Sequence, residues 1–224
     1  MLHGSCWPGP IIALPKPPAL FWRSEVVHLP PDGYADRLAK YSPVMASSSG
    51  RALPNILITG TPGTGKSTMA QMLQSQASTL RHIEVGALVK DKQLYTSWDE
   101  ELETYEMDEE RVLDELEELL EPGGAIVDFH GAELFPERWF DLVLVLRTDN
   151  GVLYPRLQSR CYSEKKLAEN MEAEIMQVIL DEAREAYQEE IVIELRSDTV
   201  EDIESNVQRV VQWMQQWSVS RAAK

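Results

Sequence analysis

The run GTPGTGKST at residues 60–68 is the feature that most constrains how this chain can fold. It follows the apolar segment 55–59 and precedes a stretch with helical character, which is the context in which such a loop binds phosphate. Gly63 and Gly65 let backbone N–H groups approach phosphate oxygens, while the following helix presents its positive N-terminal end. The motif therefore predicts a strand, a phosphate-binding loop and a helix, as in P-loop nucleotide-binding enzymes.

Three side chains of this motif have roles that follow from their positions. Lys66 is expected to supply positive charge to the β and γ phosphates, and the Ser67 hydroxyl to ligate Mg²⁺. Thr68 is expected to reach an α-phosphate oxygen. A glycine turn that binds nothing would not need this lysine and serine, so the sequence predicts a site for ATP and Mg²⁺.

A carboxylate ends a second buried segment. The run GGAIVD at residues 123–128 is typical of a turn, a buried strand and an acid at the carboxyl end of the strand, where open α/β sheets bind ligands. Asp128 is therefore the expected Mg²⁺ partner of the loop, directly or through water, although aspartate also caps turns. If the strand continues through His130, this side chain shares a face with Asp128 and is a candidate for proton transfer or water positioning. A structural role is the alternative.

Two arginines lie four residues apart on an expected helix. Arg156 and Arg160 would project from one face of it. Paired arginines neutralise charge on a transferred phosphoryl group, so both are candidates for that role. The segment 160–166 then reads as a flap that closes over nucleotide and excludes water.

From residue 55 the chain alternates between short apolar runs and amphipathic stretches. This predicts an α/β fold with a five-stranded parallel sheet flanked by helices. The expected strands are 55–59, 82–85, 125–129, 142–147 and 191–195. The expected helices are 67–76, 108–120, 151–160, 163–188 and 200–217. Trp213 and Trp217, four apart on the last of these, are expected to pack in the core.

Charge limits the classes of partner. The formal net charge is −16, which disfavours direct nucleic-acid binding, where affinity depends on lysine and arginine neutralising phosphates. Thirteen acids and one base lie between Trp98 and Glu121, either as a solvated helix face or as a docking surface for a basic protein. No run approaches the roughly 18 apolar residues of a membrane span. Cys6 and Cys161 lie far apart, which predicts neither a zinc ribbon nor a disulfide framework.

The N-terminal part of the chain has a different composition. Residues 1–52 contain scattered prolines without a sustained period and are expected to form a disordered extension, leaving residues 53–219 as the folded domain. Met45 offers an alternative start of translation, which would make residues 1–44 an artefact of gene prediction. A targeting segment is a weaker reading, because prolines interrupt any clean apolar or amphipathic run.

The runs LPNILITGTPGTGKST, VDFHGAELFPERWFDLVLVLRT and RCYSEKKLAENMEAEI closely resemble the adenylate kinase isoenzyme 6 family, nuclear adenylate kinase-like ATPases also called coilin-interacting nuclear ATPases. The likeness covers residues 53–217. It implies an adenylate-kinase-like fold with an NMP-binding segment at about 84–107 and a lid at about 159–169. It also implies phosphate transfer from ATP to AMP, ATP hydrolysis, and a role in maturation of the small ribosomal subunit and its 18S rRNA through a basic small-subunit ribosomal protein. A monomer in the nucleus and cytoplasm is expected.

The resemblance also assigns residues by position. The ATP loop of the family corresponds to Gly63, Gly65, Lys66, Ser67 and Thr68. Asp128 and His130 correspond to the acidic and histidine positions after the third strand, and Arg160 to the lid arginine that touches ATP.

Three positions depart from the family pattern. Ala87 replaces an aspartate, Lys90 replaces an arginine, and Cys161 replaces a lid glycine. Lysine holds a phosphate as a point charge, whereas the planar fork of arginine fixes its orientation, so lower AMP affinity is expected. Two alternatives to the kinase stay open. One is an ATPase-only assembly factor or switch for a basic ribosomal protein. The other, a shikimate- or gluconate-type metabolite kinase, is disfavoured by PERWF and the Asp-x-His pair.

Overall fold

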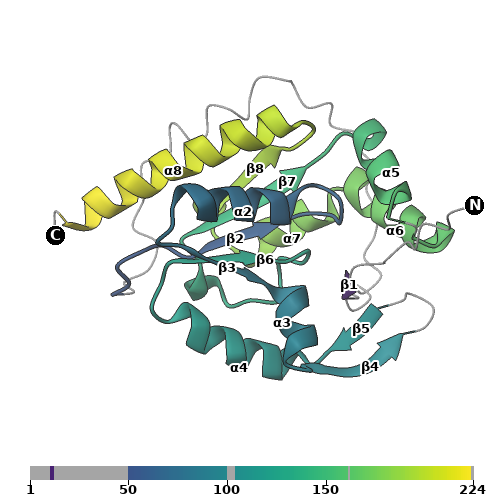
Figure 1. Ribbon diagram of the computed structural model, residues 1–224, viewed down its shortest axis with the longest axis horizontal. Helices are drawn as coiled ribbons and strands as arrows, with labels where there is room; N and C mark the ends of the chain where they lie inside the picture. The colour runs from purple at the N-terminus through teal and green to yellow at the C-terminus, as the bar shows by residue number, and fades with distance from the viewer. Residues whose placement is uncertain (1–10, 13–49, 100–103, 161, 223–224) are drawn as a thin grey trace, which may run out of the picture.

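A computed structural model describes residues 11–12, 50–99, 104–160 and 162–222. At its centre lies a parallel sheet in the order β3-β6-β2-β7-β8, flanked by helices on both faces (Figure 1). The strands are β2 (Ile56–Thr59), β3 (Arg81–Glu84), β6 (Ala125–Asp128), β7 (Leu142–Arg147) and β8 (Val192–Arg196). The five-stranded α/β fold expected from the sequence is therefore confirmed, with strand bounds that shift by one residue at most.

The sheet separates two hydrophobic core clusters, and helices cover the cluster on each face. The helices are α2 (Lys66–Gln76), α3 (Val85–Asp91), α4 (Glu109–Leu120), α5 (Asn150–Gln158), α6 (Glu164–Ile175), α7 (Val178–Ala186) and α8 (Val200–Ala222), with short 3-10 helices η1 (Glu137–Trp139) and η2 (Glu189–Ile191). Helices α2 and α8 cover one face, and α3, α4 and α7 cover the other. Trp213 and Trp217 on α8 are buried against α2 and the sheet, as expected. Among the described residues, no helix is both long and apolar enough to traverse a bilayer.

The single helix expected at 163–188 is wrong, because the chain turns at Gln177. This residue has a φ of 59°, which is uncommon for a residue with a side chain and ends the helical hydrogen-bond pattern. Helix α6 therefore packs along α5, whereas α7 turns onto the sheet beside β7 and β8. The break leaves Glu174, near the end of α6, fully buried beside the sheet.

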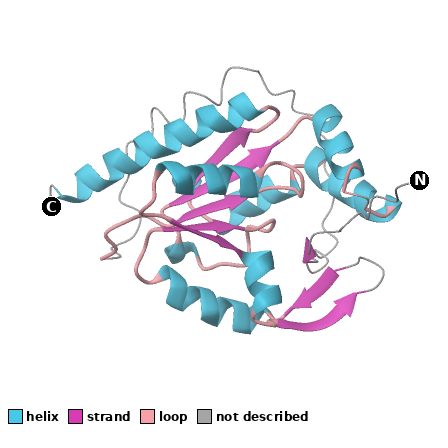
Figure 2. Cartoon of the chain, in the orientation of Figure 1, coloured by secondary structure: helices cyan, strands magenta, loops and turns pink. Residues whose placement is uncertain are grey.

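The segment between β3 and α4 forms elements of its own. Val85, expected to end a strand, instead begins α3. A hairpin of β4 (Tyr95–Asp99) and β5 (Thr104–Met107) follows, away from the main sheet (Figure 2). The two-residue strand β1 (Ile11–Ile12) pairs with β5 in parallel. The other residues of the expected disordered extension up to residue 49, Met45 among them, lie outside the described residues, so that expectation stays a prediction.

Candidate active site

The phosphate loop connects β2 to α2 and requires glycine at particular positions. Gly60 has a φ of 138°, and a Cβ there would lie 2.5 Å from the backbone oxygen of Leu146. Gly63 has a φ of 96°, and a Cβ there would lie 2.9 Å from the Leu153 side chain. Residues with side chains rarely adopt such backbone angles, and neither position has room for one. The loop therefore lies directly against β7 and α5, with the N-terminus of an 11-residue helix at its end.

Contacts from the loop after β8 and from helix α5 hold this segment in place. The Ser197 hydroxyl donates to the backbone oxygen of Thr64 at 2.6 Å. The Arg156 guanidinium donates to backbone oxygens of Gly63 at 3.3 Å, Ser197 at 3.1 Å and Asp198 at 2.5 Å. Arg156 was expected to face the transferred phosphoryl group with Arg160. Its donors are instead engaged with backbone carbonyls, so it links the phosphate loop to the loop after β8.

The Lys66 side chain folds back over its own loop. Its Nζ donates to the backbone oxygens of Gly60 at 2.7 Å and Thr61 at 3.1 Å. The pKa of Lys66 is lowered to about 8, because burial, aided by the charge of Arg160, outweighs the opposing charge of Asp128. The ammonium group is still mainly charged at neutral pH, and incoming phosphates would favour that form. Lys66 is thus placed to supply charge where the helix N-terminus already favours an anion.

Asp128 lies at the carboxyl end of β6, between β2 and β3. It pairs in register with Ile58 on one side and Glu84 on the other, and its Oδ2 lies 3.5 Å from His82 Nε2. Burial alone would raise the pKa of Asp128, but contacts with His82 and Ser67 and the charge of Lys66 outweigh it and lower the pKa. The carboxylate is therefore ionised at neutral pH, and its Oδ2 is buried without a hydrogen-bond partner among the described residues. An anionic oxygen beside the Ser67 hydroxyl fits Mg²⁺.

His82 is a neighbour of the site that the sequence did not reveal. It lies on β3, two residues before the residue in register with Asp128, so both side chains occupy the same face of the sheet. The pairing of β3 with β6 brings them together across more than forty residues of chain. Only the strand order, which local patterns do not specify, could have indicated this contact.

His130 lies beyond the end of β6. The strand ends at Asp128, so the condition under which both side chains would share one strand face is not met. The His130 ring lies 4.4 Å from the Phe129 ring, between centroids, at the edge of the aromatic cluster on the α7 side. The Thr59 hydroxyl donates to the backbone oxygen of Gly131 at 3.2 Å, which ties this segment to β2 just before the phosphate loop.

Arg160 is the other sequence candidate, and it is exposed at the end of α5. Its Nη1 lies 3.4 Å from the Tyr162 hydroxyl, and its charge lowers the pKa of Lys66, which places it on the phosphate-loop side. Helix α6 then begins with the Ser163 hydroxyl accepting from the Lys166 backbone N–H. Cys161 lies outside the described residues. The lid assignment at about 159–169 stays a prediction.

Comparisons with known proteins agree with this arrangement. A family model described as an AAA domain matches residues 56–177. The adenylate kinase isoenzyme 6 homolog of Dictyostelium discoideum is 52% identical over 75% of this chain and 95% of its own length. The chain belongs to the adenylate kinase isoenzyme 6 family. Two further homologs agree. That of Schizosaccharomyces pombe is 50% identical over 75% of this chain and 95% of its own length. That of Saccharomyces cerevisiae is 45% identical over 73% of this chain and 83% of its own length.

Membership of the adenylate kinase isoenzyme 6 family makes this chain a nucleotide-binding enzyme of the kinase type, for which ATP and Mg²⁺ are the implied ligands. Among solved structures, shikimate kinase from Bacteroides thetaiotaomicron has a TM-score of 0.53 at 18% identity, covering 73% of this chain and 99% of that one. This likeness shows the P-loop kinase fold alone and says nothing of the phosphate acceptor.

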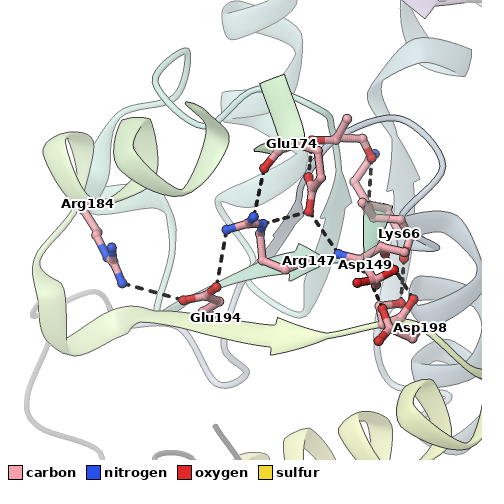
Figure 3. Close-up of polar contacts among 11 residues, drawn as sticks. Lys66, Arg147, Asp149, Glu174, Arg184, Glu194 and Asp198 are labelled. Carbon is pink, nitrogen blue, oxygen red and sulfur yellow. Dashed lines mark hydrogen bonds and ion pairs between the residues drawn. The ribbon is translucent and has the colours of Figure 1, made fainter. Parts of the chain in front are cut away.

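Glu174, like His82, is a candidate functional residue that the sequence did not reveal. Its carboxylate accepts from the Thr61 hydroxyl at 2.5 Å, from Arg147 Nε at 2.8 Å and from the Thr148 backbone N–H at 3.0 Å (Figure 3). Arg147 also pairs with Glu194 at 3.4 Å. Thr61 is separated from Glu174 by 113 residues, so no sequence spacing could indicate the contact.

Glu182 on α7 gives the folded protein a pH-dependent stability. Its Oε2 is buried without a hydrogen-bond partner among the described residues. The pKa of Glu182 is raised to about 7, mainly by burial and also by the nearby charges of Glu133 and Glu185, while a hydrogen bond with the Ala132 backbone opposes the shift. The folded state therefore holds a proton that the unfolded chain releases above about pH 4.5. Stability from this group is complete below that pH and is lost as the pH rises through about 7.

Replacing Glu182 with Gln is therefore expected to stabilise the protein in mildly alkaline solution. The amide keeps the shape but cannot ionise, so at about pH 8 the gain should be about 1 kcal/mol after allowance for partial exposure. That corresponds to a melting temperature about 2–4 °C higher. Below about pH 4.5 the two proteins should melt alike. Thermal melting across this range tests the prediction, with the exposed Glu204→Gln as control. An equal gain at every pH would contradict it.

Proposed function

We propose that this protein is a nucleoside monophosphate kinase that transfers the γ-phosphate of ATP to AMP and releases two ADP molecules, with ATP hydrolysis as a side activity. The observation that supports it most is the juxtaposition of Lys66, Asp128 and Ser67 at the carboxyl ends of the strands, with Arg160 on the same side. Family membership supports a nucleotide as acceptor.

The residues divide the work of phosphoryl transfer. The phosphate loop binds the ATP phosphates through backbone N–H groups, and Lys66 exchanges its two backbone carbonyls for phosphate oxygens. Ser67 and Asp128 would hold Mg²⁺, which neutralises charge on the β and γ oxygens when bound. Arg160 supplies further positive charge as it closes over the transferred group, whose bond to the β-phosphate oxygen breaks as the AMP phosphate oxygen attacks. His130 is the candidate for positioning a water when AMP is absent.

The acceptor would bind along the segment at about 84–107. Helix α3 begins directly after β3, next to Glu84, whose carboxylate is close enough to influence Lys66. Ala87 and Lys90 lie on this helix where the family pattern has an acid and an arginine. The acceptor phosphate therefore meets a weaker clamp, and AMP affinity should be the property most reduced.

The test follows ATP, AMP and ADP by chromatography while purified protein turns over Mg-ATP with and without AMP. The proposal requires AMP to disappear and ADP to form at twice the rate of ATP loss. Release of ADP and phosphate in equal amounts, with AMP unchanged, would show an ATPase and rule out the kinase activity.

A second candidate is an ATPase-only assembly factor or switch for a basic small-subunit ribosomal protein, acting in small-subunit maturation. Exposed acids along α4 favour it, because Glu109, Glu110 and Glu118 face solvent on a helix that carries one basic residue, Arg111. It would act as a monomer, in the nucleus and cytoplasm, without contacting RNA directly. Pull-downs in the ATP, ADP and nucleotide-free states test it. If no ribosomal protein is recovered in any of the three states, this candidate is ruled out. A fluorescent fusion that never enters the nucleus would also rule it out.

A further inference from the structure

Glu174 is a buried charge that the proposed transfer reaction does not use. It is 2% exposed, although it belongs to α6, the helix whose first residues fall within the expected lid at about 159–169. Besides its carboxylate contacts, its backbone oxygen accepts from Arg147 Nη2 at 2.9 Å. A carboxylate is costly to bury unless it is paired and hydrogen-bonded, and the contacts with Arg147, Thr148 and Thr61 meet that requirement.

One of these partners belongs to the phosphate loop. Thr61 is 1% exposed, and its hydroxyl donates to Glu174 Oε2. The backbone oxygen of Thr61 accepts from Lys66 Nζ, from the Thr64 hydroxyl at 2.9 Å and from the Thr64 N–H at 3.3 Å. Thr61 thus fixes the first turn of the loop and the resting position of Lys66, while Glu174 fixes Thr61.

The rest of the network holds Glu174 on the sheet. Arg147 ends β7 and lies between Glu174 and Glu194 of β8 (Figure 3). Glu194 also pairs with Arg184 of α7 at 3.7 Å. The Glu174 carboxylate therefore links α6 and β7 to the phosphate loop, so a shift of α6 relative to β7 would move the loop. Removal of Glu174 leaves Arg147 with its Glu194 partner, so the charge network is shortened and not abolished.

We propose that Glu174 is a positioning residue for the phosphate loop: by holding Thr61, it makes ATP affinity depend on the placement of α6. This rests on the proposed function only in that the loop binds ATP. A hydrogen bond to a charged group is among the stronger ones, and the loop must present several N–H groups together. Loss of the Glu174 contact is expected to weaken ATP binding about tenfold, which equals about 1.4 kcal/mol.

The decisive variants change Thr61, because its side chain is small and its removal leaves the charge network intact. Thr61→Val keeps the shape without the hydroxyl, and Thr61→Ser keeps the hydroxyl. Calorimetric titration with Mg-ATP should show the valine variant about tenfold weaker and the serine variant within about twofold of the parent. Equal binding by the parent and Thr61→Val, or equal losses in Thr61→Val and Thr61→Ser, would overturn the proposal.

Glu174→Ala tests the other side of the same contact. Combined with Thr61→Val it should weaken ATP binding about tenfold, as each change does alone, because both changes remove the same hydrogen bond between Glu174 and the phosphate loop. Independent effects would multiply to about a hundredfold. Asp141→Ala is the matched control, since Asp141 is a buried carboxylate, 3% exposed, that pairs with Arg51 just before β7, at the amino ends of the strands and so opposite the phosphate loop. It should lower the melting temperature without changing ATP affinity.

The outcomes separate this inference from the proposed function. If the parent protein does not bind Mg-ATP, the proposed function itself fails. If the parent binds ATP, and Thr61→Val and Glu174→Ala lose affinity while Thr61→Ser does not, Glu174 has the positioning role whether the acceptor is AMP or water. If the double variant loses a hundredfold, Glu174 acts on the site by a route other than Thr61, and the proposal is overturned.

Discussion

Replacing Lys66 with Ala is expected to reduce phosphate transfer about a thousandfold or more. In the proposed function, the ammonium is the cation that α2 brings to the β and γ phosphates, where charge is redistributed as the transferred group leaves. The fold should survive the change. Lys66 is partly desolvated, which lowers its pKa to about 8, and the cost of that burial offsets the two hydrogen bonds it makes to the loop.

Steady-state assays of ADP formation measure this loss, with thermal melting as the check on folding. Lys92→Ala is the matched control, because Lys92 is 47% exposed and pairs with Glu115 on the surface. Its turnover should equal that of the parent. Turnover by the Lys66 variant within about tenfold of the parent would show that the loop binds phosphate by its backbone alone.

The centre of the sheet was predictable because its strands are marked locally. The buried runs that became β2, β6 and β7 are continuous apolar segments between turn residues, and parallel strands buried on both faces have this composition. The phosphate loop was equally accessible, since its glycines are required by backbone angles and close contacts within the motif itself.

Contacts between distant segments could not be inferred in this way. The break at Gln177 has neither glycine nor proline to mark it, and it follows from packing of α6 on α5 and α7 on the sheet. Arg156 had the right spacing for a catalytic partner of Arg160, but the fold turns its guanidinium toward three backbone carbonyls. His82 and Glu174 reach the site only through strand order and the turn after α6.

Asp128 and Lys66 depend on one another, which makes Asp128→Asn the second variant with a large expected effect. Asparagine keeps the shape but removes the anionic ligand for Mg²⁺, so kcat should fall about a hundredfold or more. The Mg²⁺ concentration for half-maximal activity should rise as well. Asp128 also supports the charged form of Lys66, so its removal should lower the pKa of Lys66 below about 8.

A magnesium titration and a pH profile of kcat/KM together test these two roles of Asp128. In the parent, kcat/KM should fall as the pH rises through about 8, where free Lys66 loses its proton, and in the variant that fall should begin at lower pH. Asp141→Asn, a change to a buried carboxylate at the amino ends of the strands, should alter neither profile. If Asp128→Asn needed no more Mg²⁺ than the parent, Asp128 would not hold the metal. The shifted pH profile alone would then identify it as the counter-charge of Lys66.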